Sequence, residues 1–424
     1  MFSADYVHNA TIKIPISIDV NHDGAARTLN TAAAQNAILK TLAPNAQAQY
    51  AGYPTCPQAA TAAAINCAIA NGATIQDFAA NGLDSGTNLY DGQSASANGA
   101  TASTGAAFPG TNPNVGQGLF ILPQGRSGYD ALQVVLQEQK AHPFPGITDS
   151  DLQISYTLSR IVTGNSGANS ADQFFGGARS FDNDDPNRFL GRSNIDHTNE
   201  LSFGGSIGIK YGLHLAIIGH FFSAPPSSLT LDNTSGSTGQ IFTTDVNGDG
   251  VGGDLIQGTN PGSYMHSVKG KSLNQLINHY NAVYAGTPTP AGQALIAAGI
   301  MTQAQLTALG GVQQAIAPQP QNNPINNPAF RDFGFNASYP IKLKFLGGIT
   351  IIPGAAMYNV FNMSNYGSQS GTLLNQGDFS PTLYGYVNST NTPVEENNLR
   401  VSRNSGTFDA GGPRSSEFQL MVKF

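Results

Sequence analysis

The sequence predicts an all-β protein, namely a segment of an antiparallel, up-and-down transmembrane β-barrel with about eight strands and long extracellular loops that contain short helices. Three observations predict this class. Apolar and polar residues alternate over stretches of about ten residues, the length that a tilted strand needs to cross a bilayer. The joins between these stretches are alternately short and long. No run of about 18 apolar residues occurs, so we expect no transmembrane helix.

The alternation of apolar and polar residues places the strands. In residues 151–159, four apolar residues at the even positions alternate with Gln153, Ser155 and Thr157. Successive side chains of a strand point to opposite faces, so this pattern gives one apolar and one polar face. A soluble sandwich with one buried face has the same pattern, so the joins must decide between the two. The expected strands lie near residues 10–20, 127–140, 149–162, 197–211, 213–223, 329–342, 348–362 and 415–424.

The lengths of the joins favour a membrane barrel. The short joins are 141–148, the turn around Tyr211–Leu213, and 343–347; the long joins are 21–126, 163–196, 224–328 and 363–414. Alternate joins of an up-and-down sheet lie at the same end, so all the long joins share one end. Bacterial outer-membrane barrels have short periplasmic turns and long extracellular loops, whereas a soluble sandwich has no reason to sort its joins. We therefore expect the outer membrane of a Gram-negative bacterium as the location, with its lipid as a partner.

The long join 224–328 carries helix signals. Thr289 followed by Pro290 is typical of an N-cap and a first helical residue. Thr302 and Gln305 have the spacing of a capping box, and Ser272 is a candidate N-cap for a third helix. We expect two or three short helices in this join.

Composition and motifs exclude some functions and give no sign of others. Charged residues are 11% of the chain, the net charge is −7, and no run of Lys and Arg occurs, so we expect no nucleic acid as a partner. The eight histidines are scattered, and none accompanies a Ser or Cys in a nucleophile motif. There is no phosphate-binding loop and no dinucleotide fingerprint. We therefore expect no enzymatic activity.

The two cysteines, Cys56 and Cys67, lie close together in an Ala-rich stretch. An isolated close pair is typical of a local disulfide in an oxidising compartment. The alternative is two unpaired small residues. Zinc is disfavoured, because two thiolates need further ligands and no histidine cluster lies nearby.

An acidic, glycine-rich segment at 244–254 is the candidate metal site. Asp245, Asn247 and Asp249 alternate before a glycine, as in the first half of an EF-hand loop that wraps oxygen ligands around Ca²⁺. The glutamate expected at the twelfth loop position is absent, because that position is Ile256, and Asp254 fits only a shorter loop. Asx-rich turns with glycine are also ordinary loop structure. The sequence leaves both interpretations open, and Ca²⁺ is the one cofactor that it suggests.

The last strand ends in alternating apolar residues, Phe418, Leu420, Val422 and Phe424. A terminal strand that ends in an aromatic residue resembles the signal by which the barrel-assembly machinery inserts outer-membrane proteins. The alternative is an ordinary amphipathic edge strand. We expect the signal, with the assembly machinery as a partner.

Several stretches, taken in order along the chain, resemble the C-terminal barrel of Oar-like TonB-dependent receptors of the acidobacterial type. Such receptors normally carry a signal peptide, often a carboxypeptidase-regulatory-like domain, and a plug before the barrel. The matching stretches are residues 4–9, 77–86, 108–134, 154–159, 244–250, 329–335 and 357–367.

The resemblance implies a transporter barrel of the plugged 22-stranded class, of which this chain would supply about the last eight strands. The first ten residues lack the basic start and apolar core of a signal peptide, and we expect no plug in this sequence. TonB would then act only through the missing plug, and the chain would supply wall strands and ligand-facing outer loops for an unknown ligand. The alternative function is a stand-alone small outer-membrane barrel that acts as an adhesin or structural surface protein, since eight strands can close alone.

Overall fold

The fold was analysed in a computed structural model. The structure describes residues 1–19, 26, 28–43, 53, 55–84, 107–108, 119–164, 188, 190–193, 195–231, 239–250, 252–318, 329–343, 349–363, 365, 372–373 and 413–423.

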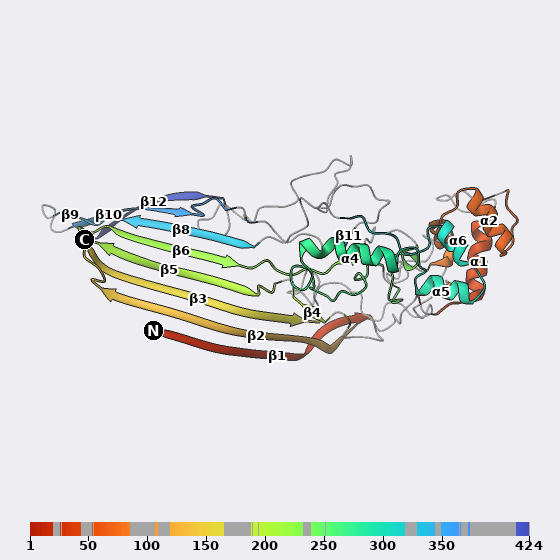
Figure 1. Ribbon diagram of the computed structural model, residues 1–424, viewed down its shortest axis with the longest axis horizontal. Helices are drawn as coiled ribbons and strands as arrows, with labels where there is room; N and C mark the ends of the chain where they lie inside the picture. The colour runs from red at the N-terminus through yellow and green to blue at the C-terminus, as the bar shows by residue number, and fades with distance from the viewer. Residues whose placement is uncertain are drawn as a thin grey trace.

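One antiparallel sheet dominates the described chain, which confirms the predicted antiparallel β class (Figure 1). Eight strands follow one another in sequence order, and the short strands β4 (Gly191–Arg192) and β9 (Ile341–Leu343) pair with β3 and β10. The sheet is open rather than closed into a barrel, with β1 and β12 as its edges. The eight strands are β1 (Phe2–Asp19), β2 (Leu119–Ala141), β3 (Ile147–Thr163), β5 (Asn199–Ile209), β6 (His214–Phe222), β8 (Phe330–Ser338), β10 (Ile349–Tyr358) and β12 (Ser415–Lys423).

Three strand boundaries differ from the sequence prediction. β1 begins at Phe2 rather than near residue 10, and it pairs with β2 from Phe2 opposite Leu136 to Asp19 opposite Leu119. β2 begins at Leu119 rather than near residue 127, because its first residues pair with the second half of β1 and each strand supplies the other's hydrogen-bond partners. The strand expected at 329–342 is split at Pro340, since proline has no N–H to donate to the ladder.

The short and long joins lie at opposite ends of the sheet (Figure 1). The join between β5 and β6 is a tight turn in which the backbone N–H of Ile209 donates to the carbonyl of Leu213 at 2.7 Å. Tyr211 and Gly212 both have positive φ, 82° and 99°, as tight hairpin turns require. We call this end of the sheet the turn end. The opposite end, beyond which the helices lie (Figure 1), is the loop end.

The long joins 21–126 and 224–328 both contain helices. Thr289 caps α5 by accepting the N–H of Gly292, and Thr302 and Gln305 form the capping box of α6. Ser272 is not an N-cap: α4 begins after Lys269, and Ser272 lies within its first turn. None of the described helices is long and apolar enough to span a membrane. The helices are α1 (Thr31–Thr41), α2 (Ala62–Ala70), α3 (Ile75–Phe78), the π-helical turn η2 (Ala79–Leu83), the 3-10 turn η5 (Gln240–Phe242), α4 (Gly270–Val283), α5 (Pro290–Ala297) and α6 (Gln303–Ala308).

The buried cores lie in the loops rather than on the sheet. The larger core unites α1, α2, α3, η2, η5, α5 and α6, and we call these elements the loop module. A second core forms around Tyr264 and Tyr280, beside α4 and a short parallel pair, β7 (Thr230–Leu231) and β11 (Thr372–Leu373). The largest fully buried side chains of the described residues all belong to these two cores: Tyr264, Tyr280, Phe78, Phe108, Phe242, Ile38, Leu42, Ile65, Leu83, Leu229 and Ile256.

Candidate functional site

The strand register collects apolar residues on one face of the sheet, which we call the apolar face. Residues directly opposite each other in a sheet point to the same side. Phe2 lies opposite Leu136, and Leu136 lies opposite Ile154. The row continues through Phe203 on β5. By the same register the apolar face comprises Phe2, Tyr6, Leu132, Val134, Leu136, Leu152, Ile154, Tyr156, Leu158, Leu201, Phe203, Ile207, Leu215, Ile217, Phe221, Phe333, Phe335, Ile351, Pro353, Met357, Phe418, Leu420 and Val422.

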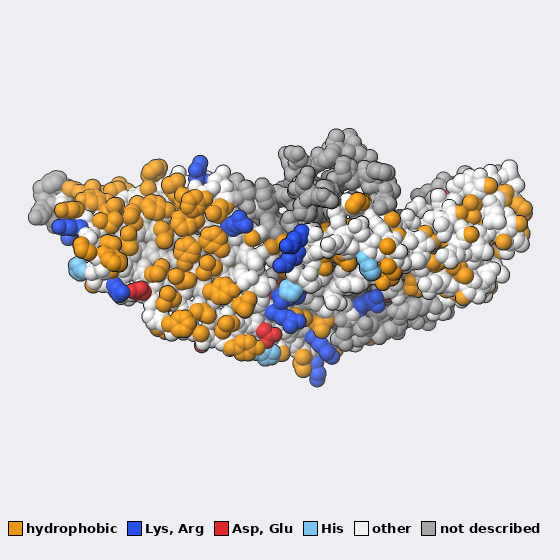
Figure 2. Space-filling model, viewed as in Figure 1, with side chains coloured by type: hydrophobic (Ala, Val, Ile, Leu, Met, Phe, Trp, Pro, Cys, Tyr) orange, Lys and Arg blue, Asp and Glu red, His pale blue; other side chains and the backbone are white. Residues whose placement is uncertain are grey.

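The residues of the apolar face are exposed on the edge strands and half-buried along most of the middle strands. Tyr6 on β1 is 70% exposed, Leu158 on β3 is 44% exposed, and Leu420 on β12 is 70% exposed. Figure 2 shows hydrophobic side chains covering the sheet half of the molecule, while the helices lie beyond the loop end (Figure 1). An apolar surface this large on a folded protein marks a site of contact with a protein or a membrane.

The opposite face of the sheet is mostly polar. Gln133 on β2 lies between Asp5 and Thr157, and Thr157 lies opposite Glu200. Side-chain hydrogen bonds join neighbouring strands on this face. Gln137 donates to Gln153 at 3.1 Å, and Ser202 Oγ lies 3.0 Å from Nδ1 of His220. One face of the sheet is therefore apolar and the other mostly polar, and this difference extends from β1 to β12.

Charged residues border the apolar face at both ends. At the loop end, His8, Asp130 and Arg160 form one cross-strand row directly beyond Leu132 and Leu158. At the turn end, Lys140 Nζ lies 2.6 Å from Oε1 of Glu138. On β3 the apolar positions lie between residues 150 and 160, a length of about 33 Å along the strand, or about 25 Å of height at a tilt near 40°. That height equals the apolar band of outer-membrane barrels.

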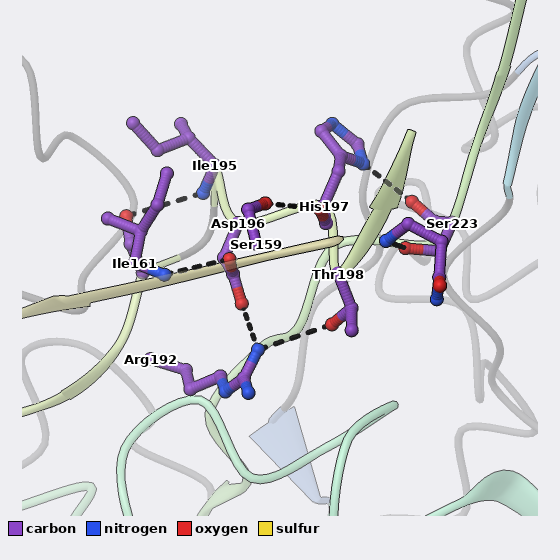
Figure 3. Close-up of polar contacts among 10 residues, drawn as sticks. Ser159, Ile161, Arg192, Ile195, Asp196, His197, Thr198 and Ser223 are labelled. Atoms are coloured by element: carbon purple, nitrogen blue, oxygen red, sulfur yellow. Dashed lines mark hydrogen bonds and ion pairs between the residues drawn. The ribbon is translucent and has the colours of Figure 1, made fainter. Parts of the chain in front are cut away.

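Buried polar contacts fix the loop end of β3 (Figure 3). Asp196 is fully buried, its Oδ1 accepts the backbone N–H of Ile161 at 2.9 Å, and its Oδ2 pairs with Arg192. Arg192 also donates to Oγ1 of Thr198 at 3.2 Å, and Ser159 Oγ donates to the carbonyl of His197 at 2.8 Å. Because every group in this cluster has a partner, the chain before β5 is held against β3 and Arg192 is fixed in place.

The loop module joins two segments that are far apart in the sequence. The N–H of Ile75 donates to the carbonyl of Leu309 at 2.8 Å, and that of Gly239 donates to Asp84 Oδ2 at 2.7 Å. The side chain of Gln305 donates to the carbonyl of Ala62 and to Asn66 Oδ1. Helices from the two long joins therefore share one core.

A disulfide bonds Cys56 to Cys67, the pair that the sequence singled out, with 5.6 Å between their Cα atoms. Cys56 is buried in the core of the loop module, and Cys67 lies on α2, packed against that core. The bond therefore ties the segment before α2 to the helix itself.

The acidic segment folds into a compact loop in which the carboxylates are buried. Asp245 is fully buried, Asp249 is 1% exposed and Asp254 is 9% exposed. Asp245 accepts the N–H groups of residues 248, 249 and 250. Asp254 accepts those of Val246 and Asn247, and the side chain of Asn247 donates to both Asp249 and Asp254. The structure thus brings the four predicted residues together, and their oxygens already accept hydrogen bonds within the loop.

The electrostatics of this loop disfavour three ionised carboxylates. Burial raises the pKa of Asp245 to about 8, and the charge of Asp249 adds to that rise. Burial also raises the pKa of Asp254, again with a contribution from Asp249. Among the described residues, no group of three or more His, Cys, Asp or Glu side chains has an arrangement that could hold a metal ion.

The strand expected to carry the assembly signal is β12, the edge strand of the sheet. Its apolar residues belong to the apolar face: Phe418 is 86% exposed and Val422 is 41% exposed. Phe424 lies outside the described residues, as do most of the long joins 163–196 and 363–414.

A search with protein-family models and a search of the curated proteins both found no match to this chain. The arguments about function therefore depend on the residues and their arrangement.

Proposed function

We propose that this chain forms part of the wall of an outer-membrane β-barrel, of the type found in TonB-dependent receptors. The apolar face would contact lipid and the polar face would line the lumen. The loop module would lie outside the cell and take part in contacting the transported ligand. The chain would act in transport rather than catalysis.

The continuous apolar face carries this proposal. It crosses all eight strands of the sheet path without interruption by a charged residue, between a charged row at the loop end and the ion pair of Glu138 with Lys140 at the turn end. Burying such a surface stabilises a protein by about 25 cal/mol for each Å² removed from water. Lipid tails satisfy this surface without a second protein layer, and the segregation of short turns from long loops supports the same interpretation.

The open sheet supports a large barrel over a stand-alone one. A closed barrel of eight strands requires β1 to pair with β12, whereas these strands are the two separate edges of the sheet. An unpaired strand edge cannot face lipid, because its N–H and C=O groups would lack hydrogen-bond partners. We infer that further strands complete the wall between β1 and β12, as in the 22-stranded class.

The experiment compares neighbouring residues on the two faces of β3. The full chain, together with the strands that complete the wall, is reconstituted in phosphatidylcholine vesicles with a fluorescent label at Tyr156→Cys or at Thr157→Cys; Cys56 and Cys67 are bonded to each other and do not take the label. Successive strand residues face opposite sides, so the label at position 156 should be quenched by bromine-labelled lipid tails. The label at position 157 should be quenched by aqueous iodide instead.

Two results would contradict the proposal. One is equal quenching of both labels by iodide, which would indicate a sheet in water. The other is recovery of the completed barrel in the supernatant after the vesicles are sedimented. Labels at Leu201→Cys and Ser202→Cys on β5 provide an independent repeat, because these residues also lie on the apolar and the polar face.

A further inference from the structure

One part of the polar face combines phenylalanines with acidic residues. It lies toward the loop end of three neighbouring strands, β5, β6 and β8 (Figure 1). The register places six side chains there on the same side of the sheet. They form two cross-strand rows, with Glu200, Phe222 and Phe330 nearer the loop end and Ser202, His220 and Asp332 in the next row. We call these six residues the acidic aromatic patch.

Two phenyl rings stack within this patch. Phe222 and Phe330 are cross-strand partners, with ring centroids 5.3 Å apart and an angle of 23° between the ring planes. Both side chains are half-buried. The ring of His197 lies 5.7 Å from that of Phe222, and its Nδ1 is hydrogen-bonded to the carbonyl of Ser223 (Figure 3). Because the face of an aromatic ring carries partial negative charge, it attracts a cation placed over it.

The two carboxylates of the patch have no cationic partner. Glu200 and Asp332 lie at opposite corners of the two rows, and among the residues that the structure describes neither has a basic side chain at ion-pair distance. The ring of His220 is a hydrogen-bond partner of Ser202 instead, with Nδ1 3.0 Å from Oγ. Oδ1 of Asp332 is withdrawn from solvent and has no hydrogen-bond partner. A partly buried carboxylate in this state is poorly compensated and favours an incoming positive charge.

The basic residues of the neighbouring strands do not neutralise the patch. Arg331 lies opposite Phe221 and therefore on the apolar side of the sheet. Lys342 and Lys423 share the polar face but belong to the turn end. Lys342 follows Asp332 by ten residues, which is about 30 Å along a strand. That distance is several times the range of about 8 Å over which salt screens charges in physiological solution.

We propose that the acidic aromatic patch binds a soluble organic cation, in which an amidinium, guanidinium or ammonium group adjoins an apolar ring. This inference rests on the proposed function, because the polar face would then line the path of the transported ligand, and it names the chemical class of that ligand. The phenyl rings would contact the apolar part and the carboxylates would balance the charge. The patch measures about 10 Å across the strands and about 7 Å along them, which is room for one such group.

The test compares three probes of nearly the same shape: cationic benzamidine, neutral benzamide and anionic benzoate. Calorimetry measures their binding to the full chain, together with the strands that complete the wall, in micelles of an uncharged detergent. Benzamidine should bind more tightly than benzamide by a factor on the order of ten, and benzoate more weakly than either. Equal binding of benzamidine and benzamide, or tighter binding of benzoate, would overturn the proposal.

Variants of nearly unchanged shape separate charge from misfolding. Glu200→Gln combined with Asp332→Asn should reduce the affinity for benzamidine to that for benzamide, whereas Asp332→Glu keeps the charge and should retain binding. Phe330→Leu should weaken the binding of benzamidine about fivefold, because one ring is lost. The control is Asp151→Asn on the same face, where the carboxylate already accepts a hydrogen bond from Ser206, and it should bind as the wild type does. Unchanged binding by the double variant would refute the patch as the site.

Two further measurements identify the occupant and keep the two proposals separate. Millimolar Ca²⁺ should displace benzamidine no better than Na⁺ at equal ionic strength, and specific displacement by Ca²⁺ would indicate a metal site and overturn the inference. A negative result with all three probes leaves the proposed function intact if the label at position 156 is still quenched from the lipid side. Failure of that quenching would count against the proposed function, whatever the probes show.

Discussion

The sheet and the loop module differ in where their apolar side chains lie: the module buries them in its own core, whereas the sheet exposes many of them on one face. In the loop module, Phe78, Phe108 and Phe242 are fully buried among helices, as in a water-soluble domain. On the sheet, Tyr6 and Phe418 are mostly exposed, although the register gathers them with other apolar residues into one face. The module therefore carries its own core, whereas the sheet depends on its surroundings to cover its apolar face. Substitutions should affect the two regions separately.

The largest effect is expected from Phe242→Ala in the core of the loop module. Phe242 is fully buried, with its ring 5.8 Å from that of Phe108. Its loss should lower the free energy of unfolding of the module by about 3–5 kcal/mol. Hydrogen exchange of the vesicle-bound chain should accelerate in α1, α5 and α6, and remain unchanged in the strands. The control is Leu39→Ala on α1, where the side chain is 40% exposed. Equal acceleration in β3 would show that module and sheet unfold as one unit.

An arginine on the apolar face should affect the sheet instead. Ile154→Arg is expected to destabilise the inserted chain by about 2–4 kcal/mol, the cost of an arginine at mid-bilayer on the lipid side of a barrel. Ser155→Arg, one residue away on the polar face, should cost much less. Urea unfolding from vesicles measures both. Equal costs would mean that the two faces have the same environment.

Removing the disulfide should have a somewhat smaller effect, confined to the loop module. Replacing Cys56 and Cys67 together by alanine releases a short closed loop, which in the chain-entropy description costs about 2–3 kcal/mol. Proteolysis within residues 55–84 should become faster, with insertion unchanged. Mass spectrometry of non-reduced peptides should find the two cysteines linked, and two free thiols in the mature protein would refute the bond.

The smallest effect concerns the acidic loop and pH. A carboxyl group with a raised pKa favours the folded state while it is protonated, so this contribution is present below about pH 4 and is lost as the pH rises through about 8. In EDTA, thermal unfolding of the loop segment should shift to lower temperature between pH 5 and pH 9. Asp249→Asn should reduce that slope, because Asp249 raises the pKa of both Asp245 and Asp254.

Calcium sharpens the same experiment. If Ca²⁺ binds the buried carboxylates, millimolar Ca²⁺ should restore stability at pH 8 in the wild type and not in Asp249→Asn. An unfolding temperature that is the same with and without Ca²⁺ would exclude the calcium site, and the loop would then be an ordinary Asx-rich turn.

The sequence predicted the sheet better than the loop module, for a physical reason. Strand alternation is local, so the residues of β3 or β6 reveal their faces without knowledge of their neighbours. The start of β1 was missed because its length is set by pairing with β2. Two helices of the first long join also had local signals: Thr74 with Asp77 has capping-box spacing, and Thr61 caps α2.

Local reasoning from the sequence could not predict the two cores of the loops. That Gln305 contacts Asn66 follows from how the joins fold together and not from any pattern in either segment. The paired cysteines needed no such knowledge, because the two lie within one short stretch. For the acidic loop, the sequence identified the residues but not their burial, which raises the pKa of Asp245.

The division of the loop module between two joins also constrains the order of assembly. Its core requires residues such as Asn66 and Gln305, which are 239 positions apart and are separated by the strands from β2 to β7. Contacts of such long sequence separation form slowly, because a long stretch of chain must first be restricted. If the sheet enters a membrane, both joins must reach the same side before the module can close. Protease resistance of the module would then appear after strand insertion. The time at which this resistance appears would report when this part of the wall is complete.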